Sequence, residues 1–296
     1  MSAENPVTSG LPPRIAGFAA ETVGRLNAAI DRSWPRDGSN VWELIDSDGR
    51  RVFLKHHQTA RFHEREVTAY RLWVSRLGPG RSPVLLAADA SLLAIVVTAL
   101  PGRIARDLRV TAATESEIHR QAGTLLRRLH EAAPPSATNA GSVRVAARAE
   151  GHIQRAAGLL EPGQARLIRE HAARLAEITR LLPAVPTHGD AQTKNFLWDA
   201  ASHRLGLIDF ERAELGPAVR DLVRLEYGPW DHKPHLRTAF LAGYGRSLTD
   251  AEEAALRSYA ALDAVSALQW GTTNNDKEIV RRAHRTLARL SGRDSP

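Results

Sequence analysis

Three oxygen-bearing side chains, Asp190, Asn195 and Asp209, flank a short apolar segment of the chain and could together hold a hard cation. Carboxylate and amide oxygens suit Mg²⁺, which usually keeps several waters and takes its remaining ligands from substrate phosphates. The set therefore points to chemistry on a phosphate-bearing substrate. The alternative is that these residues only shape turns, since Asp and Asn both favour turns.

A β-hairpin is expected to bring two of these side chains together. One apolar run begins at Phe196 and a second ends at Ile208, and they predict two antiparallel strands joined by a short loop. Pairing Phe196 with Ile208 makes Asn195 and Asp209 the next pair outward. Neighbouring strands lie about 4.8 Å apart, so the two side chains could converge on one ion.

Lysine is rare in this chain, and one lysine stands where a phosphate could be bound. The positive charge is carried mainly by arginine, and none of the four lysines follows a glycine, so no Walker A loop is present. Lys55 ends a β-rich run, and Glu64 or Glu66 follows on a predicted helix. A strand lysine held by a helix glutamate is the other large solution for phosphoryl transfer. Glu66 is preferred, because it precedes the apolar face of that helix.

Two motifs carry a family resemblance. Residues 188–195 read HGDAQTKN and residues 208–211 read IDFE, and they resemble the HGDxxxxN and IDF(E/D) motifs of the aminoglycoside phosphotransferase/choline kinase family. The similarity continues through Asp221-Leu222 and reaches back to Lys55, so it spans residues 35–225. It implies an α+β, two-lobed protein-kinase-like fold with a small β-rich N-lobe and a larger helical C-lobe.

The resemblance also implies roles for individual residues. Asp190 would be the catalytic base, Asn195 and Asp209 would bind Mg²⁺, and Lys55, paired with Glu66, would hold the α/β-phosphates of ATP or GTP. The remaining nucleotide contacts would come from a phosphate-covering loop and from a hinge that binds adenine through its backbone, which are Gly38, Ser39 and Asn40 and the segment Thr98–Leu100.

Three further positions near the motifs have open or supporting roles. Lys194, four residues after Asp190, either reaches the γ-phosphate or lies at the surface. Asp221 is expected to brace the catalytic loop by binding its backbone. The histidines at positions 56, 57 and 63 show no metal-ligand spacing and are interpreted as surface or packing residues.

The acceptor site is expected on the C-terminal helices, where the candidates are Trp230, Asp231, Asp263 and Trp270. Carboxylates would suit a cationic acceptor and an aromatic cage a quaternary ammonium, while the alternative is that both tryptophans belong to the core. The net charge of +7 does not favour a polycation. The predicted activity is therefore ATP-dependent O-phosphorylation of a small molecule, an antibiotic or nucleoside-like compound ahead of choline-like ones. The alternatives are a metabolic kinase acting on a sugar, homoserine-like or amino-alcohol substrate, and a catalytically silent kinase-like binding protein.

Composition limits the other classes. The chain of 296 residues has no cysteine, which excludes disulfides, thiolate catalysis and Cys-based metal sites. The N-terminal residues lack the pattern of a signal peptide, and the longest apolar run is too short to cross a bilayer, so a cytoplasmic protein without a membrane partner is predicted. The arginines are spread among acidic residues with no docking motif, so no nucleic-acid partner is expected.

The predicted elements divide near a Pro-Gly step at residues 101–102, giving an N-terminal lobe at 1–100, with 1–13 as a loose tail, and a helical lobe at 101–296. A ligand site is expected between the two lobes. The first lobe is predicted to contain a helix at 15–30, a hairpin at 41–45 and 51–55, a helix at 60–77, and strands at 84–88 and 92–99. The second is predicted to contain helices from Thr114 to Glu131, at 164–182, from a capping box at Thr249 and Glu252, and at 279–290.

Overall fold

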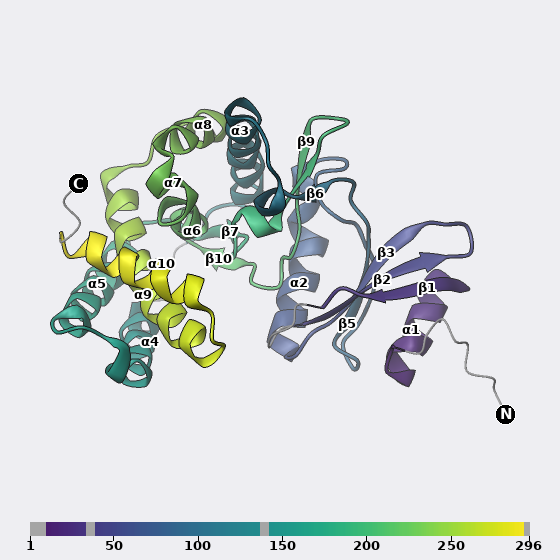
Figure 1. Ribbon diagram of the computed structural model, residues 1–296, viewed down its shortest axis with the longest axis horizontal. Helices are drawn as coiled ribbons and strands as arrows, with labels where there is room; N and C mark the ends of the chain where they lie inside the picture. The colour runs from purple at the N-terminus through teal and green to yellow at the C-terminus, as the bar shows by residue number, and fades with distance from the viewer. Residues whose placement is uncertain (1–9, 34–38, 137–141, 293–296) are drawn as a thin grey trace. The chain divides into compact units, whose positions relative to one another are not determined.

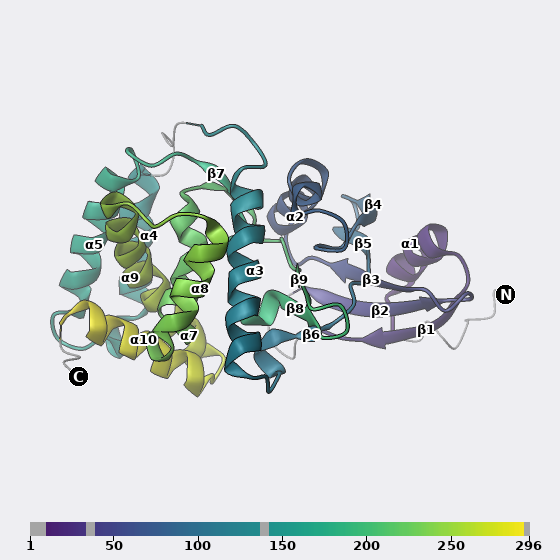
Figure 2. The same ribbon diagram turned by 90° about the horizontal axis from the view of Figure 1, so that it is seen from above.

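The computed structural model describes residues 10–33, 39–136 and 142–292, which form an α+β fold (Figures 1 and 2). These residues fall into two compact units. Unit 1 comprises the described residues up to Leu108 together with Lys194–Glu214, and unit 2 comprises Arg109–Thr193 and the residues from Leu215 onward. The hairpin that follows Asp190 therefore belongs to unit 1, whereas the sequence placed everything after residue 100 in one lobe.

Unit 1 is built on an antiparallel sheet with the strand order β1-β2-β3-β5-β4. Leu44 and Leu54 of the central strands are fully buried on one face, where they pack with Ile15 of the first helix. Successive side chains of a strand point to opposite faces, so Lys55 faces the other side of the sheet. The elements are α1 (Pro13–Val23), β1 (Leu26–Asp31), β2 (Asn40–Asp46), β3 (Arg51–His56), α2 (Ala60–Leu72), η2 (Val74–Leu77), β4 (Leu85–Asp89) and β5 (Ala94–Thr98).

The β2–β3 hairpin is confirmed, and the helix before it is shorter than predicted. The carboxylate of Asp46 accepts hydrogen bonds from the backbone N–H groups of Asp48 and Arg50 and so closes the turn. The helix predicted to reach residue 30 instead ends at Val23. Gly24 adopts a φ of 84°, which is accessible to glycine and stops the helix, and the following residues pair with β2 as β1.

A second, three-stranded sheet of unit 1 has the order β6-β8-β9 and corrects the predicted register. Its strands are β6 (Arg103–Ile104), β8 (Phe196–Asp199) and β9 (Arg204–Leu207), with η3 (Ala105–Asp107) and η5 (Thr193–Asn195) beside them. Phe196 pairs with Leu207, not Ile208, and the Ile208 N–H donates to the carbonyl oxygen of Asn195 at 3.1 Å. A slip of one residue turns each side chain to the opposite face. Asp209 compensates with a left-handed φ of 69°, which is uncommon for a residue with a side chain.

Unit 2 is mainly helical. Helices α4, α5, α9 and α10 share an apolar core that includes Ile153, Ile168, Leu268 and Leu287. The elements are α3 (Ala112–His130), α4 (Ser142–Arg155), η4 (Ala157–Leu159), α5 (Gln164–Ile178), β7 (Val185–Thr187), β10 (Glu214–Gly216), η6 (Ala218–Leu222), α6 (Val223–Glu226), α7 (Pro229–His232), α8 (Pro234–Tyr244), α9 (Asp250–Thr273) and α10 (Lys277–Leu290). Within the described ranges, no helix is both long and apolar enough to span a membrane.

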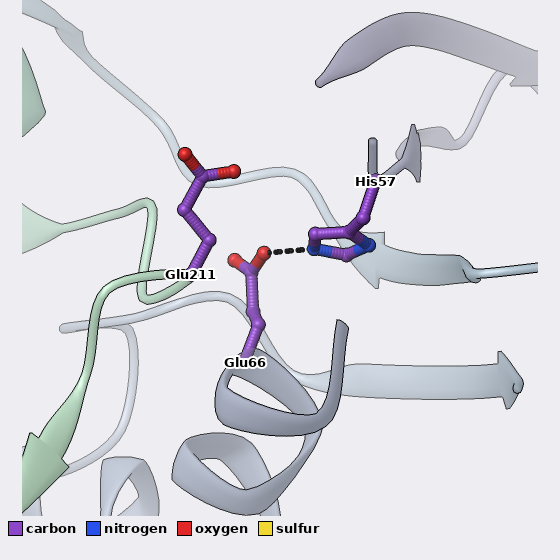
Figure 3. Close-up of side chains that lie close together, drawn as sticks. All are labelled: His57, Glu66 and Glu211. Atoms are coloured by element: carbon purple, nitrogen blue, oxygen red, sulfur yellow. Dashed lines mark hydrogen bonds and ion pairs between the residues drawn. The ribbon is translucent and has the colours of Figure 1, made fainter. Parts of the chain in front are cut away.

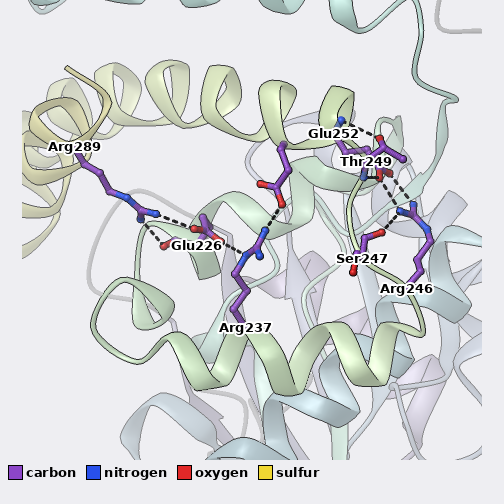
Figure 4. A network of polar contacts seen from close by, with 8 residues as sticks. Glu226, Arg237, Arg246, Ser247, Thr249, Glu252 and Arg289 are labelled. Atoms are coloured by element: carbon purple, nitrogen blue, oxygen red, sulfur yellow. Dashed lines mark hydrogen bonds and ion pairs between the residues drawn. The ribbon is translucent and has the colours of Figure 1, made fainter. Parts of the chain in front are cut away.

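Helix starts in unit 2 follow the sequence signals in one case and not in another. The capping box of α9 is confirmed: Thr249 Oγ1 accepts from the N–H of Glu252, and the Glu252 carboxylate accepts from the N–H of Thr249. Arg246 binds the same carboxylate (Figure 4). The capping box predicted at Thr114 is wrong, because Thr111 caps α3 and the helix begins at Ala112.

Candidate active site

The ammonium of Lys55 is the centre of a buried charge cluster in unit 1. Its Nζ lies 2.6 Å from Asp209 Oδ1, 3.0 Å from Glu66 Oε2 and 3.0 Å from Glu211 Oε2. Burial acts to lower the pKa of Lys55, but the three carboxylates outweigh it and raise that pKa well above its usual value. The lysine is therefore permanently charged and held at the end of β3.

The carboxylate of Glu66 has three partners, which are Lys55, Phe210 and His57. It projects from α2 and is 2% exposed, whereas Glu64, the other candidate, is exposed. Besides Lys55, its carboxylate accepts a hydrogen bond from the N–H of Phe210 at 3.2 Å and lies 2.6 Å from Nε2 of His57 (Figure 3). Burial opposes ionisation, yet Lys55 and His57 together lower the pKa of Glu66 below its usual value.

His57, Glu66 and Glu211 bring ligand atoms within 4.8 Å of one another, a spacing that could hold a metal ion. The cation at this place is the Lys55 ammonium, which contacts both glutamates. A divalent ion there would have to displace a buried lysine from two of its partners. We therefore assign the three residues to the lysine and not to a metal.

Asn195 and Asp209 are the two residues predicted to bind magnesium, and both belong to unit 1. Asn195 is 3% exposed, and its backbone carbonyl oxygen accepts a hydrogen bond from the N–H of Ile208. Asp209 is 29% exposed at its side chain, so a ligand can reach its carboxylate. An amide oxygen and a carboxylate match the hard-oxygen preference of Mg²⁺, so the donor set fits the ion.

The remaining predicted nucleotide residues of unit 1 lie near the same strands. Ser39 Oγ donates to Glu211 Oε2 at 2.8 Å, and Asn40 begins β2 opposite His56. Thr98 ends β5, where its Oγ1 accepts from the N–H of Val84, and the partly exposed Leu100 follows two residues later. Gly38 lies outside the described residues. Lys194 begins the unit 1 segment that leads into β8.

In unit 2, Asp190 is the centre of a second cluster. Its carboxylate is 4% exposed, forms an ion pair with Arg224, and accepts a hydrogen bond from Gln192 Nε2 at 2.5 Å. The Arg224 guanidinium also donates to Asp263 Oδ1 at 3.1 and 3.2 Å. Burial acts to lower the pKa of Arg224, but the two aspartates outweigh it and raise that pKa above its usual value.

Asp221 braces the loop that carries Asp190, as predicted. Its buried carboxylate accepts from the N–H groups of His188 and Gly189, each at 2.7 Å, and lies 3.0 Å from Nε2 of His130. The hydroxyl of Tyr244 is 2.8 Å from the other nitrogen of His130. Burial opposes ionisation of Asp221, but the hydrogen bond from His130 and its charge lower the pKa of this carboxyl below its usual value.

The four candidate acceptor residues occupy different settings. Asp263 of α9 is joined to Asp190 through Arg224. Trp230 is 3% exposed and donates from Nε1 to His119. Asp231 pairs with Arg289 at 3.0 Å, and Trp270 lies partly exposed in α9. Contact with Arg224, the ion-pair partner of Asp190, therefore favours Asp263 over the other three.

Sequence reasoning missed Arg224 and His57. Arg224 stands 34 residues after Asp190 and 39 before Asp263, and no local pattern links those positions. His57 had a usable signal, because it follows Lys55 by two residues and so continues on the same face of the strand. It is 1% exposed, which excludes the surface alternative and leaves packing, to which the structure adds the contact with Glu66.

A strand lysine clamped by a helix glutamate, together with a braced His-Gly-Asp loop, defines a kinase-type phosphotransferase. The family comparison agrees: a model described as the phosphotransferase enzyme family, APH, matches residues 31–262. The chain belongs to this family and is a phosphotransferase with an alcohol group as acceptor. No curated protein matched the sequence.

Solved structures share the kinase-like fold at low sequence identity. A GDP and kanamycin complex of APH(2")-IIia is 14% identical with a TM-score of 0.69, covering 95% of this chain and 99% of that one. A ternary complex of aminoglycoside phosphotransferase APH(4)-Ia with ADP and hygromycin B is 15% identical with a TM-score of 0.67, covering 93% and 96%. Macrolide 2'-phosphotransferase type I is 18% identical with a TM-score of 0.60, covering 93% and 95%.

Proposed function

We propose that the chain transfers the γ-phosphoryl group of ATP, or of GTP, to a hydroxyl of a small-molecule antibiotic or a nucleoside-like compound. The observation that carries the proposal is the Lys55 cluster, in which one ammonium is shared by Glu66, Asp209 and Glu211. An isolated ion pair would need one carboxylate. Three carboxylates around one ammonium leave an excess of negative charge beside the partly exposed Asp209, and this excess can bind the cation that accompanies a triphosphate.

The residues have distinct roles in the transfer. Asp190 accepts the proton of the acceptor hydroxyl, and the acceptor oxygen forms a bond to the γ-phosphorus. The bond from that phosphorus to the β–γ bridging oxygen breaks, and the nucleoside diphosphate leaves with the electron pair. Lys55 binds the α/β-phosphates and offsets their charge. Because the transition state is loose, positioning and charge neutralisation are the main demands on the protein.

Asn195 and Asp209 would hold Mg²⁺, which when bound neutralises charge on the phosphates. Only four residues separate Asp190 from Asn195, so the chain ties the proton acceptor covalently to a metal ligand. A carboxylate of ordinary basicity is adequate for Asp190, since the acceptor proton leaves late in such a transfer.

The acceptor class follows from charge around Asp190. Arg224 is shared by Asp190 and Asp263, so its positive charge offsets half of the negative charge of the two carboxylates. This favours a hydroxylated acceptor over a polycation. Kanamycin and hygromycin B in the similar structures are themselves cationic, but together with the macrolide phosphotransferase they support an antibiotic as the first class to test. Phosphorylation of such a compound would serve resistance or self-protection.

The test is detection of phosphorylated products by mass spectrometry. The protein is incubated with Mg²⁺, ATP or GTP, and pooled antibiotics, nucleosides, sugars and amino alcohols, with Asp190→Asn in parallel. A product with an antibiotic or nucleoside that needs the intact aspartate supports the proposal. A product only with sugars or amino alcohols favours a metabolic kinase, and nucleotide binding without any product favours a catalytically silent protein.

A further inference from the structure

His57 has no part in the transfer as described, yet it is one of the most constrained side chains in unit 1. It directly follows β3 and is 1% exposed. Its Nδ1 lies 3.1 Å from the carbonyl oxygen of Leu93, and its Nε2 lies 2.6 Å from Glu66 Oε2. Figure 3 shows the Glu66 carboxylate rising from α2 to face the imidazole.

The partners of His57 fix the orientation of its ring. The Glu66 carboxylate accepts hydrogen bonds from the Lys55 ammonium and from the N–H of Phe210, so Nε2 is the donor in the 2.6 Å contact with His57. The other ring nitrogen faces the carbonyl oxygen of Leu93. The imidazole is therefore held at both ends, by the backbone and by Glu66.

Lys55 contacts three carboxylates, and a lysine ammonium does not by itself fix the direction of its contacts. Its shortest contact is with Asp209, not with Glu66. The same oxygen of Glu66, Oε2, receives both Lys55 and His57, while Oε1 receives the N–H of Phe210. Fixing the glutamate thus fixes the one carboxylate partner of the lysine that comes from α2.

We propose that His57 is a positioning residue for nucleotide binding. By its contact with Glu66 it fixes the orientation of that carboxylate, so that Lys55 stays directed toward the α/β-phosphates. The inference rests on the proposed function, since it assigns those phosphates to Lys55. His57 does not touch the reacting atoms. Its effect is expected on the affinity for nucleotide and on kcat/KM for nucleotide, not on the KM for the acceptor.

Two near-isosteric substitutions separate positioning from packing. The amide nitrogen of glutamine can take the place of Nε2, so His57→Gln keeps a donor toward Glu66 and loses the bond to Leu93. The amide nitrogen of asparagine takes the place of Nδ1, so His57→Asn keeps the bond to Leu93 and loses the donor toward Glu66. Both variants lose ring volume, and thermal unfolding reports how much stability each one loses.

His63 provides a matched control. It is 4% exposed, its ring centroid lies 5.5 Å from that of His57, and its buried Nε2 has no hydrogen-bond partner among the described residues. His63→Leu removes a neighbouring buried imidazole without removing a hydrogen bond to Glu66. It is expected to leave nucleotide affinity within about twofold of the wild type, because no charge-assisted bond is lost.

The measurement is calorimetric titration with Mg²⁺–ATP, combined with kcat and KM for nucleotide and acceptor. His57→Asn is expected to weaken nucleotide binding by about tenfold or more, while His57→Gln stays within about threefold of the wild type. Equal losses in both variants, in step with their loss of thermal stability, would overturn the inference. Wild-type protein that does not bind Mg²⁺–ATP would instead overturn the proposed function, so the two failures are distinct.

Discussion

The Lys55 cluster of unit 1 and the Asp190 cluster of unit 2 both place one cation among carboxylates, but they differ in the balance of charge. Lys55 contacts three carboxylates, whereas Arg224 joins two. The first cluster retains a surplus of negative charge beside a partly exposed aspartate, and the second comes closer to neutrality. A charge surplus suits a cation-bound triphosphate, and near-neutrality suits an uncharged hydroxyl.

The two cations also differ in directionality. A lysine ammonium is a compact charge that can turn among its partners, whereas a guanidinium is a planar fork that fixes the direction of each bond. The alignment of the Lys55 cluster therefore depends on neighbouring groups, and His57 and Phe210 supply it by holding Glu66. The Asp190 cluster carries its alignment within Arg224 and in the brace from Asp221.

The largest expected effect separates the clusters completely. Asp190→Asn removes the proton acceptor of the proposed transfer but leaves the Lys55 cluster intact. We expect kcat to fall by about 10³-fold, which is typical of losing a positioned acid or base, while the Kd for Mg²⁺–ATP stays unchanged. Steady-state kinetics and calorimetry measure the two quantities. Loss of nucleotide affinity in this variant would mean that the clusters are not functionally separable.

Lys55→Met is the opposite substitution. It leaves Asp190 intact and removes the one positive charge among Glu66, Asp209 and Glu211. The uncompensated carboxylates should repel the phosphates, so we expect kcat/KM for nucleotide to fall on the order of 10²-fold. Measured at saturating nucleotide, the acceptor KM should be unchanged. A changed acceptor KM would contradict the assignment of Lys55 to the nucleotide.

Arg224→Lys tests whether the fork, and not only the charge, aligns Asp190. The lysine keeps a positive charge but cannot bind both aspartates in the same geometry. We expect about a tenfold loss in kcat with nucleotide Kd unchanged, because a misaligned base loses only part of its effect. Asp263→Asn, which leaves the Arg224–Asp190 pair in place, is the matched variant and should lose less. Equal activity of Arg224→Lys and the wild type would show that charge alone suffices.

The Lys55 cluster was more predictable from sequence than the Asp190 cluster, for a physical reason. Lys55 and Glu66 lie on neighbouring elements, so strand and helix periodicity are enough to bring them together. The β2–β3 turn and the capping box of α9 are likewise local signals. Arg224 of α6 meets Asp263 of α9 and Asp190 of a loop only in the folded chain, and no local pattern encodes these contacts.

The errors in the predicted elements have the same origin. The segment that forms β1 has no strong strand pattern, and its pairing with β2 decides its structure. The register of β8 and β9 was one residue off, because the prediction assumed extended backbone up to Asp209. The left-handed φ of this residue redirects its side chain toward Lys55. Neither Asp209 nor its two chain neighbours is a glycine or proline, so the sequence gives no local signal of this conformation.

Asp221→Asn tests the brace of the Asp190 loop through its pH dependence. Because the pKa of Asp221 is lowered in the folded state, its ionisation stabilises the fold above the ordinary value of about 3.9 and stops doing so as pH falls through the folded pKa. We expect the variant to be less stable by about 2 kcal/mol at neutral pH. The gap should narrow as the pH falls through the folded-state pKa, which lies below the ordinary value, because both states of the wild type are then protonated. Urea unfolding at several pH values measures it, and a gap independent of pH would contradict the charged brace.

Thr249→Ala has the smallest expected effect and provides the reference for all the others. It removes the oxygen that caps α9 while leaving the Arg246–Glu252 pair in place (Figure 4). Loss of an N-cap costs about 1 kcal/mol, so the midpoint of thermal unfolding should fall by a few degrees. The helix begins 13 residues before Asp263, so nucleotide affinity and kcat should both be unchanged at temperatures well below the transition. If this variant did lose activity in proportion to stability, similar losses in the Arg224 and Asp221 variants would have to be attributed to unfolding. In that case, only changes in the ratio of kcat to nucleotide affinity would still distinguish the two clusters.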